Sequence, residues 1–234
     1  MKNITTLALL WLLALVPALA QTSSETRSVS TFSAIDVSSG IELNLVAGQP
    51  QRVDVSAETP ELRERIKTEV RNGVLKISFD RKVSEMFGKS SFVKNLRVNV
   101  TAAQLTALSA SSGSTVTVAG PYATETLKLE VSSGAVLKAN FTATSLEAQV
   151  SSGGVATVAG KIQRLDVRSS SGGVFKGADL QAARCDASAS SGGTIAVAVQ
   201  ETLAAKASSG GEVRYSGSPS VSKNTSSGGS VRGR

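Results

Sequence analysis

Ser170-Ser171-Gly172 belongs to a repeat that decides the fold of this 234-residue chain. From residue 111 onward the tripeptide Ser-Ser-Gly occurs seven times, and an earlier copy ends at Gly40. Successive glycines of the seven copies are 21, 19, 19, 20, 18 and 18 residues apart, which indicates one stacked structural unit. We place the corners of this unit at Gly113, Gly134, Gly153, Gly172, Gly192, Gly210 and Gly228.

Apolar and polar residues alternate around each glycine. Before Gly172, Leu165 and Val167 are apolar, whereas Asp166 and Arg168 are charged. A period of two is typical of a strand with one buried face. Each unit is therefore predicted to be a strand, a Ser-Ser-Gly corner, a second strand and a looser return segment. The position seven residues before the glycine holds Leu127, Leu146, Leu165, Cys185, Leu203 and Val221.

The length of the unit predicts an all-β fold, a single-stranded right-handed parallel β-helix with about 18–21 residues per coil. A unit this short cannot hold a strand and a crossover helix. Six intervals of about 4.8 Å would make a rod roughly 29 Å long. We expect the glycines to adopt positive φ and to let backbones stack closely. The serine hydroxyls are expected to bond corner amides or the next coil, in preference to a role as nucleophiles.

The first 20 residues have the features of a secretion signal. Lys2 is followed by an apolar run, residues 7–16, and by Ala18-Leu19-Ala20, which predicts cleavage after Ala20. An uncleaved anchor is the alternative. We expect no later membrane span, lipid-attachment cysteine or translocator domain. These features predict export to the periplasm, the cell surface or the medium.

The amino-acid composition limits the kinds of catalytic and metal site that this chain can form. The chain has no histidine, which excludes Ser-His-Asp and Cys-His catalysis and most zinc sites, so we expect neither a cofactor nor a metal. Cys185 is the only cysteine and shares its register with leucines, which predicts a buried, unreactive thiol. Loss of Lys2 with the leader lowers the formal net charge from +7 to +6.

Residues 28–234 are predicted to form one domain, with irregular opening coils over 28–108 and regular repeats over 109–234. Asn72-Gly73 is a strong hairpin signal between strands 67–71 and 74–79. A short helix is expected over residues 60–66, beginning with Pro60. Further strands are expected at 31–37, 41–46, 52–57 and 96–101, and an exposed loop at 81–92.

The opening region resembles a known family. Phe32-x-x-Ile35-x-Val37-Ser-Ser-Gly40-Ile41-x-Leu43, followed by Val53-x-Val55, Leu62, Ile66 and Asn72-Gly73-x-Leu75-x-Ile77, is similar to the auto-transporter adhesin head GIN domain, over roughly residues 30–215. Gly40-Ile41-Glu42 stands where that family has Gly-Ile-Asn. The resemblance implies a secreted bacterial right-handed β-helix and carries no catalytic residues with it.

A basic segment gives a candidate binding patch. Residues 81–97 contain five cations against Glu85 alone, and Lys223, Arg232 and Arg234 follow near the end of the sequence. Such clusters could engage acidic glycans, lipopolysaccharide or envelope phosphates. We favour the simpler interpretation, in which solvated charge keeps a β-rich protein soluble and its sheet edges unpaired. Nucleic acid is not expected, because stacking aromatics are lacking. The patch comprises Arg81, Lys82, Lys89, Lys94 and Arg97.

Three function classes follow. We predict a non-enzymatic, adhesin-like or ligand-binding envelope protein, whose partner is an envelope polysaccharide or another surface protein. The alternative is a polysaccharide lyase or hydrolase, for which Asp166 and Asp186, one coil apart in the same register, are the candidate carboxylates. We favour an ordinary surface ladder as the explanation of that pair. Ice binding is not expected, because Thr115, Thr117 and Thr157 do not continue in register.

Overall fold

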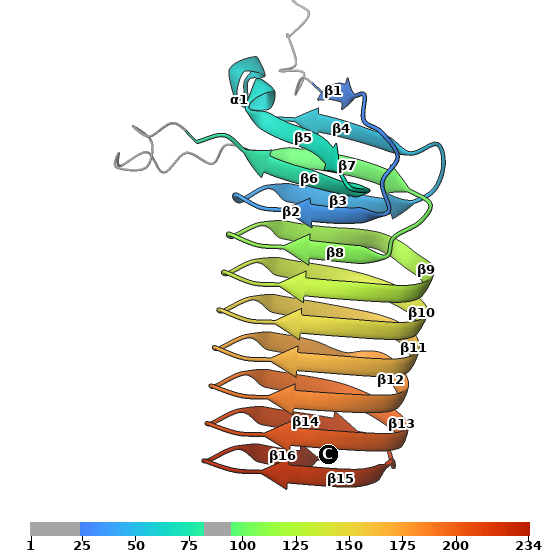
Figure 1. Cartoon of the computed structure of the whole chain (residues 1–234), viewed down its shortest axis with the longest axis vertical. Helices are drawn as coiled ribbons and strands as arrows, with labels where there is room; N and C mark the ends of the chain where they lie inside the picture. Colours follow the sequence, from blue (N-terminus) through green and yellow to red (C-terminus); the bar gives the residue numbers. More distant parts are fainter. Residues whose placement is uncertain (1–23, 82–94) are drawn as a thin grey trace, which may run out of the picture.

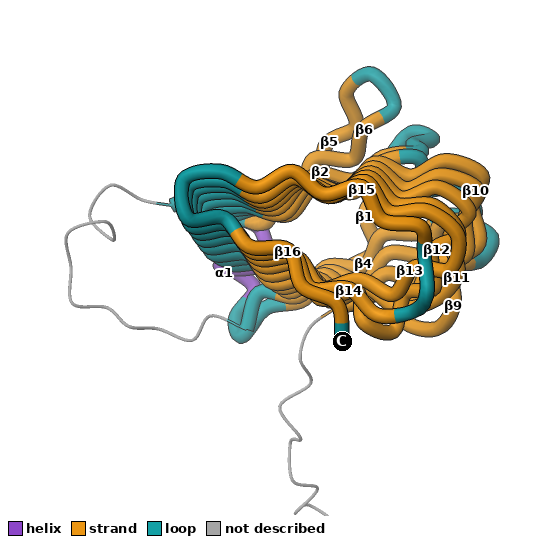
Figure 2. Tube along the Cα trace, turned by 90° about the horizontal axis from the view of Figure 1, so that it is seen from below, coloured by secondary structure: helices purple, strands orange, loops and turns teal. Residues whose placement is uncertain are grey.

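The computed structural model describes residues 24–81 and 95–234, which form a rod of stacked coils (Figure 1). Each long strand pairs in parallel with the next, as the predicted β-helix requires. The tight turns between successive coils are stacked along one edge of the rod (Figures 1 and 2). The five long strands are β9 (Thr115–Val131), β10 (Val136–Val150), β11 (Val155–Ser169), β12 (Val174–Ala189) and β13 (Thr194–Ala207).

The strand register confirms the predicted columns of apolar residues. Leu146 on β10 pairs with Leu165, Leu165 with Cys185, and Cys185 with Leu203. All four side chains are buried inside the tube. Because the strands pair in parallel, outward residues stand over their register partners in the next coil wherever the register is regular. The outer surface therefore consists of straight side-chain columns that run along the rod.

Each Ser-Ser-Gly sequence forms a type I′ turn. Ser152 and Gly153 have φ of +48° and +73°, and the amide of Gly154 donates a 2.8 Å hydrogen bond to the carbonyl of Ser151. The seven corner glycines have φ between +71° and +77°, and the serines before them between +46° and +52°. In the described part of the chain, successive turns are joined by backbone hydrogen bonds, and no corner serine hydroxyl bonds the next coil.

The close backbone approach expected at the corner glycine occurs one residue later. A Cβ on Gly153 would meet no atom within 4 Å, so only its φ favours glycine there. A Cβ on Gly154 would lie 2.6 Å from the carbonyl oxygen of Val131 in the preceding coil. Glycine recurs at this second position in Gly154, Gly173, Gly193, Gly211 and Gly229.

The return segment is also more regular than expected. Strand β10 continues through the bend opposite the turns, and Phe141 and Thr142 there keep parallel partners in β11. Phe141 and Ile162 point inward and are buried, so the bend extends the core. Coils of different length are accommodated by register irregularities in this part, for example between Thr157 and Gly160.

An irregular cap covers the N-terminal end of the rod (Figure 1). Strands β1 (Ser24–Arg27) and β4 (Arg52–Ser56) continue the sheet in antiparallel pairing beyond β7 (Arg97–Ala102). The hairpin of β5 (Ile66–Arg71) and β6 (Val74–Phe79) joins the opposite side through β2. The first coil is formed by β2 (Ala34–Val37) and β3 (Glu42–Ala47), and β8 (Ala107–Ala110) begins the second, because β2 pairs with β8 and β3 with β9.

Two boundaries in the cap differ from the sequence prediction. The helix α1 (Pro60–Glu64) begins at Pro60, with Thr59 as its N-cap, but it ends two residues early. Ile66 instead starts β5, pairs with Phe79 and is buried, because a β-branched apolar residue gains more in the sheet than in an exposed helix. Strand β1 precedes residue 28, where we placed the domain start. Residues 1–20 and most of the expected 81–92 loop lie outside the described residues.

The last coil consists of β15 (Ser220–Thr225) and β16 (Ser230–Gly233), which follow β14 (Glu212–Ser216). Its side chains are more exposed than those of the coils before it. Lys223 pairs with Ala205 and so occupies an inward register position, yet it is exposed.

Candidate functional site

The rod has two long outer faces with different charge. We call the outward residues of the strand segments before each turn the mixed face; its regular part covers residues 126–130, 145–149, 164–168, 184–188 and 202–206. The outward residues after each turn form the basic face, whose regular part covers residues 115–119, 136–140, 155–159, 174–178 and 194–198. The tight turns separate the two faces on one side, and the bends on the other.

Several charges on the mixed face form ion pairs with one another, whereas Arg164 and Lys206 form none among the described residues. Lys128 lies 2.8 Å from Glu130, and Arg168 lies 3.1 Å from Asp166. Their separation by two residues places both members on the same face of one strand. The lysine neighbour holds the pKa of Glu130 below its usual value through a hydrogen bond and its charge. Opposite charges therefore largely cancel on this face.

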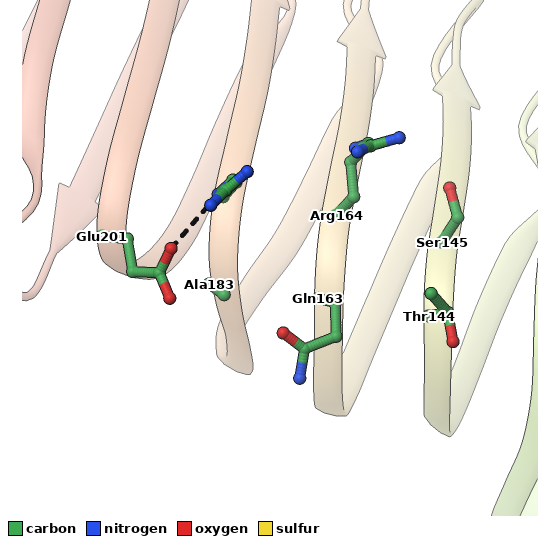
Figure 3. Close-up of a pocket in the computed structure, with 7 residues that line it drawn as sticks. Thr144, Ser145, Gln163, Arg164, Ala183 and Glu201 are labelled. Carbon is green, nitrogen blue, oxygen red and sulfur yellow. Dashed lines mark hydrogen bonds and ion pairs between the residues drawn. The ribbon is translucent and has the colours of Figure 1, made fainter.

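A shallow cleft of about 210 Å³ lies at the edge of the mixed face, next to the bends (Figure 3). Arg164 and Arg184 are neighbours in β11 and β12, and Arg184 donates a 3.2 Å hydrogen bond to Glu201. No ion pair with Arg164 is found among the described residues. Because Glu201 neutralises Arg184, the cleft carries the single positive charge of Arg164 and otherwise offers polar contacts. Its lining residues are Thr144, Ser145, Gln163, Arg164, Ala183, Arg184 and Glu201.

The two candidate catalytic carboxylates occupy neighbouring positions on the mixed face. Asp166 and Asp186 are register partners, as predicted, and Glu147 precedes them in the same column. Arg168 is bonded to Asp166, and Asp186 is exposed. Across the described ranges, no group of three or more metal-ligating side chains comes together. Asp186 lines a shallow depression of about 340 Å³ together with Arg164 and Arg184, and Asp166 does not line it.

The basic face carries a straight column of cations. The position four residues after each corner glycine holds Lys138 on β10, Lys176 on β12 and Arg214 on β14, with Thr157 and Ala196 on the coils between them. Arg232 on β16 continues the column. Lys138 and Lys176 are exposed, and neither forms an ion pair within residues 24–81 and 95–234. We call Lys138, Lys176, Arg214 and Arg232 the cation column.

Within the regular coils, the outward columns on either side of the two lysines contain no acidic residue. Asp179, three residues after Lys176, is exposed at the register irregularity of the bend and forms no ion pair among the described residues. From β9 to β13 the neighbouring outward columns hold only neutral residues, among them the aligned Val136, Val155 and Val174. Val136 is 43% exposed, which is unusual for an aliphatic side chain in this molecule. Beyond β13, Glu212 accepts two hydrogen bonds from Arg214, at 2.9 and 2.7 Å. The uncompensated positive charge is thus centred on Lys138 and Lys176.

Only part of the predicted basic patch can be placed. Lys82, Lys89 and Lys94 lie outside the described residues. Arg97 stands on the N-terminal extension of the basic face, where it forms a 3.0 Å ion pair with Glu42. Arg81 is exposed near Gly40. Sequence reasoning missed the cation column, although counting four residues on from each glycine would have found it.

Cys185 is buried in the core, as its register predicted. Burial, together with the nearby carboxylates of Asp186 and Asp166, raises the pKa of its thiol to about 12. The thiol is therefore protonated at neutral pH and faces the inside of the tube.

These features define a class of protein: a capped parallel β-solenoid that has one face with mixed charges and one basic face. The family profile described as "Putative auto-transporter adhesin, head GIN domain" matches residues 31–219, and the chain belongs to that family. No curated protein matches the sequence at a significant level. In the described part of the chain, no helix is long and apolar enough to cross a membrane.

Solved structures share the fold at low sequence identity. A "putative adhesin" from Bacteroides fragilis has a TM-score of 0.80 and 19% identity, with 91% of this chain and 96% of the other covered. A "putative adhesin" from Parabacteroides distasonis has a TM-score of 0.64 and 21% identity, covering 91% and 96%. A "putative lipid binding protein" from the same species has a TM-score of 0.59 and 20% identity, covering 92% and 98%.

Proposed function

We propose that this protein is an exported, non-enzymatic adhesin-like rod that binds an acidic polysaccharide of a cell envelope or surface. The observation that carries the proposal is the basic face, where Lys138 and Lys176 stand uncompensated on a flat neutral surface. Charges that serve only solubility are expected to be interspersed with the opposite sign, as they are on the mixed face. A one-sided charge instead attracts an anionic partner.

Family membership and the leader support export. The family is described as an adhesin domain, and the first 20 residues have the pattern of a cleaved secretion signal. Expression of the full chain in a bacterial host should yield exported protein that begins at Gln21. N-terminal sequencing of the exported fraction checks this, and an intact leader on that protein would favour an anchor.

Co-sedimentation tests the ligand class. The purified exported protein is mixed with cross-linked polygalacturonate or with neutral cellulose, at low and high salt, and the supernatant is assayed for released sugar. We expect retention on polygalacturonate alone, and its loss at high salt, because exposed charges are screened. Equal retention on cellulose would contradict the acidic ligand. Released sugar would overturn the non-enzymatic assignment and direct attention to Asp166 and Asp186.

A further inference from the structure

Three cations of the cation column recur on every second coil, and Arg232 follows Arg214 on the next coil. Lys138, Lys176 and Arg214 lie on β10, β12 and β14, in one unbroken column of register partners. Neighbouring parallel strands are about 4.8 Å apart, so these cations follow each other at about 10 Å along the rod. This separation exceeds the screening length of about 8 Å at physiological salt. Each cation therefore acts as a separate contact point.

We propose, on the basis of the proposed function, that the ligand is a linear acidic polysaccharide lying along the rod axis. One polymer chain contacts Lys138 and Lys176 together and continues toward Arg214 and Arg232. The direction follows from the column, since a polymer crossing the rod at right angles would meet a single one of these cations. Simultaneous contacts by one chain add their free energies, because the second anion is already held near its cation.

The residues beside the cations fit a sugar polymer. Val136, Val155 and Val174 line up two residues before the column positions and offer apolar contact to the C–H faces of sugar rings. Thr157, between the two lysines, is partly exposed and offers a hydroxyl group. The regular part of the basic face carries no aromatic side chain on which a nucleic-acid base could stack.

Arg214 is expected to contribute less than the lysines. Its guanidinium donates from Nε and from a terminal nitrogen to Glu212, so it is already neutralised locally. Lys138 and Lys176 have no such partner in the described structure. The inferred contact is thus strongest over β10 to β12 and weaker toward the last coil.

Titration calorimetry with hyaluronan oligosaccharides tests the alignment, because these carry one carboxylate on every second sugar. We expect one oligosaccharide per rod. Lys138→Ala and Lys176→Ala should each weaken binding about 3-fold, and the double variant about 10-fold, with stoichiometry unchanged. Lys206→Ala removes the same charge from the mixed face and should leave the affinity unchanged.

A charge-conserving variant tests whether binding depends on the position of the positive charge or only on the net charge of the protein. Lys176→Ala combined with Ala204→Lys moves one positive charge beside Asp186 on the mixed face. We expect it to bind as weakly as Lys176→Ala alone, and wild-type affinity would overturn the inference. All altered side chains are at least partly exposed, and unchanged thermal melting serves as the check on folding.

Other outcomes distinguish the inference from the proposed function. If Lys138→Ala reduces the number of bound oligosaccharides but leaves their affinity unchanged, the lysines are separate sites and the alignment is wrong, although acidic-glycan binding stands. If the wild-type protein binds neither hyaluronan nor polygalacturonate, the proposed function itself fails. Binding to phosphatidylglycerol vesicles without binding to either polymer would overturn the sugar class.

Discussion

The amide of Gly153 donates a hydrogen bond of 3.2 Å to the carbonyl oxygen of Ser171, which lies one coil further along the rod. The same bond joins Gly172 to Ser191 at 3.2 Å and Gly192 to Ser209 at 3.1 Å. Because donor and acceptor are both backbone groups, the turns are connected independently of the serine side chains. What the turn requires of its sequence is two successive residues with positive φ.

Gly172 and Gly173 should respond differently to a single methyl group. Gly172→Ala should lower the free energy of unfolding by about 1–2 kcal/mol, because alanine resists positive φ although the space around it is open. Gly173→Ala should lower it further, because its Cβ would collide with the carbonyl oxygen of Val150 in the preceding coil. Gly172→Val should lower the free energy of unfolding more than Gly172→Ala does. Urea unfolding measures all three, and equal losses for the two alanine variants would contradict the distinction.

Serine is a poor residue for the first central position of these turns. Ser152 has a φ of +48°, a conformation that asparagine tolerates better. Ser152→Asn should therefore raise the free energy of unfolding by up to about 1 kcal/mol. Ser151→Asn, one residue earlier and without positive φ, is the matched control and should give no gain. A gain of equal size in both variants would rule out the backbone explanation.

The regular coils were predictable because their signal is repeated. Each inward column, such as that of Leu146, Leu165 and Leu203, appears once per coil at a nearly fixed offset from the glycine. The bends were harder, because their large inward residues form no fixed column: Phe141 pairs with Gly160, and Ile162 pairs with Ala143. Outward positions are free of packing constraints, so they show no apolar pattern.

The candidate site was missed for a related reason. Lys138, Lys176 and Arg214 are each 38 residues apart, and no local run of charge marks them. The charge cluster at residues 81–97 attracted attention because it is contiguous. Arg97 is the member of this cluster that lies on the extension of the basic face, and it is paired with Glu42, which lies 55 residues earlier in the chain.

Cys185 should resist thiol reagents in the folded protein. Its pKa is raised to about 12, first by burial and then by the carboxylates of Asp186 and Asp166, so almost no thiolate exists at neutral pH. Ellman's reagent should react only after unfolding. Ser171→Cys places a thiol on an exposed turn and should react at once in the native state. Rapid native labelling of wild-type protein would show that the register of β12 is wrong.

Asp54 should make the stability of the N-terminal cap depend on pH. Its burial raises the pKa of the carboxyl group, but hydrogen bonds from Thr26 at 2.6 Å and from Arg52 lower it more, so the net pKa lies below its usual value. A depressed folded-state pKa stabilises the protein above the unfolded-state pKa, and this stabilisation is lost as pH falls through the folded-state value.

Asp54→Asn should therefore lower the melting temperature at neutral pH and make little difference in strong acid. The loss should correspond to less than about 1 kcal/mol, because surface ion pairs contribute little. Asp36→Asn, which removes a carboxylate from β2 outside the cap strands, is the control. An effect of Asp54→Asn that persists unchanged in acid would exclude the carboxylate as its cause.

The spacing of the cation column makes two coils the natural unit by which such a rod could grow. Duplication of the 38 residues from Lys138 up to Lys176 would add two coils and place a new lysine in phase with the others. Duplication of a single coil would lengthen the core equally well but would shift half of the column out of step. Selection for a longer adhesive surface would thus favour insertions of even numbers of coils. Selection for stability alone would favour even and odd numbers of coils equally.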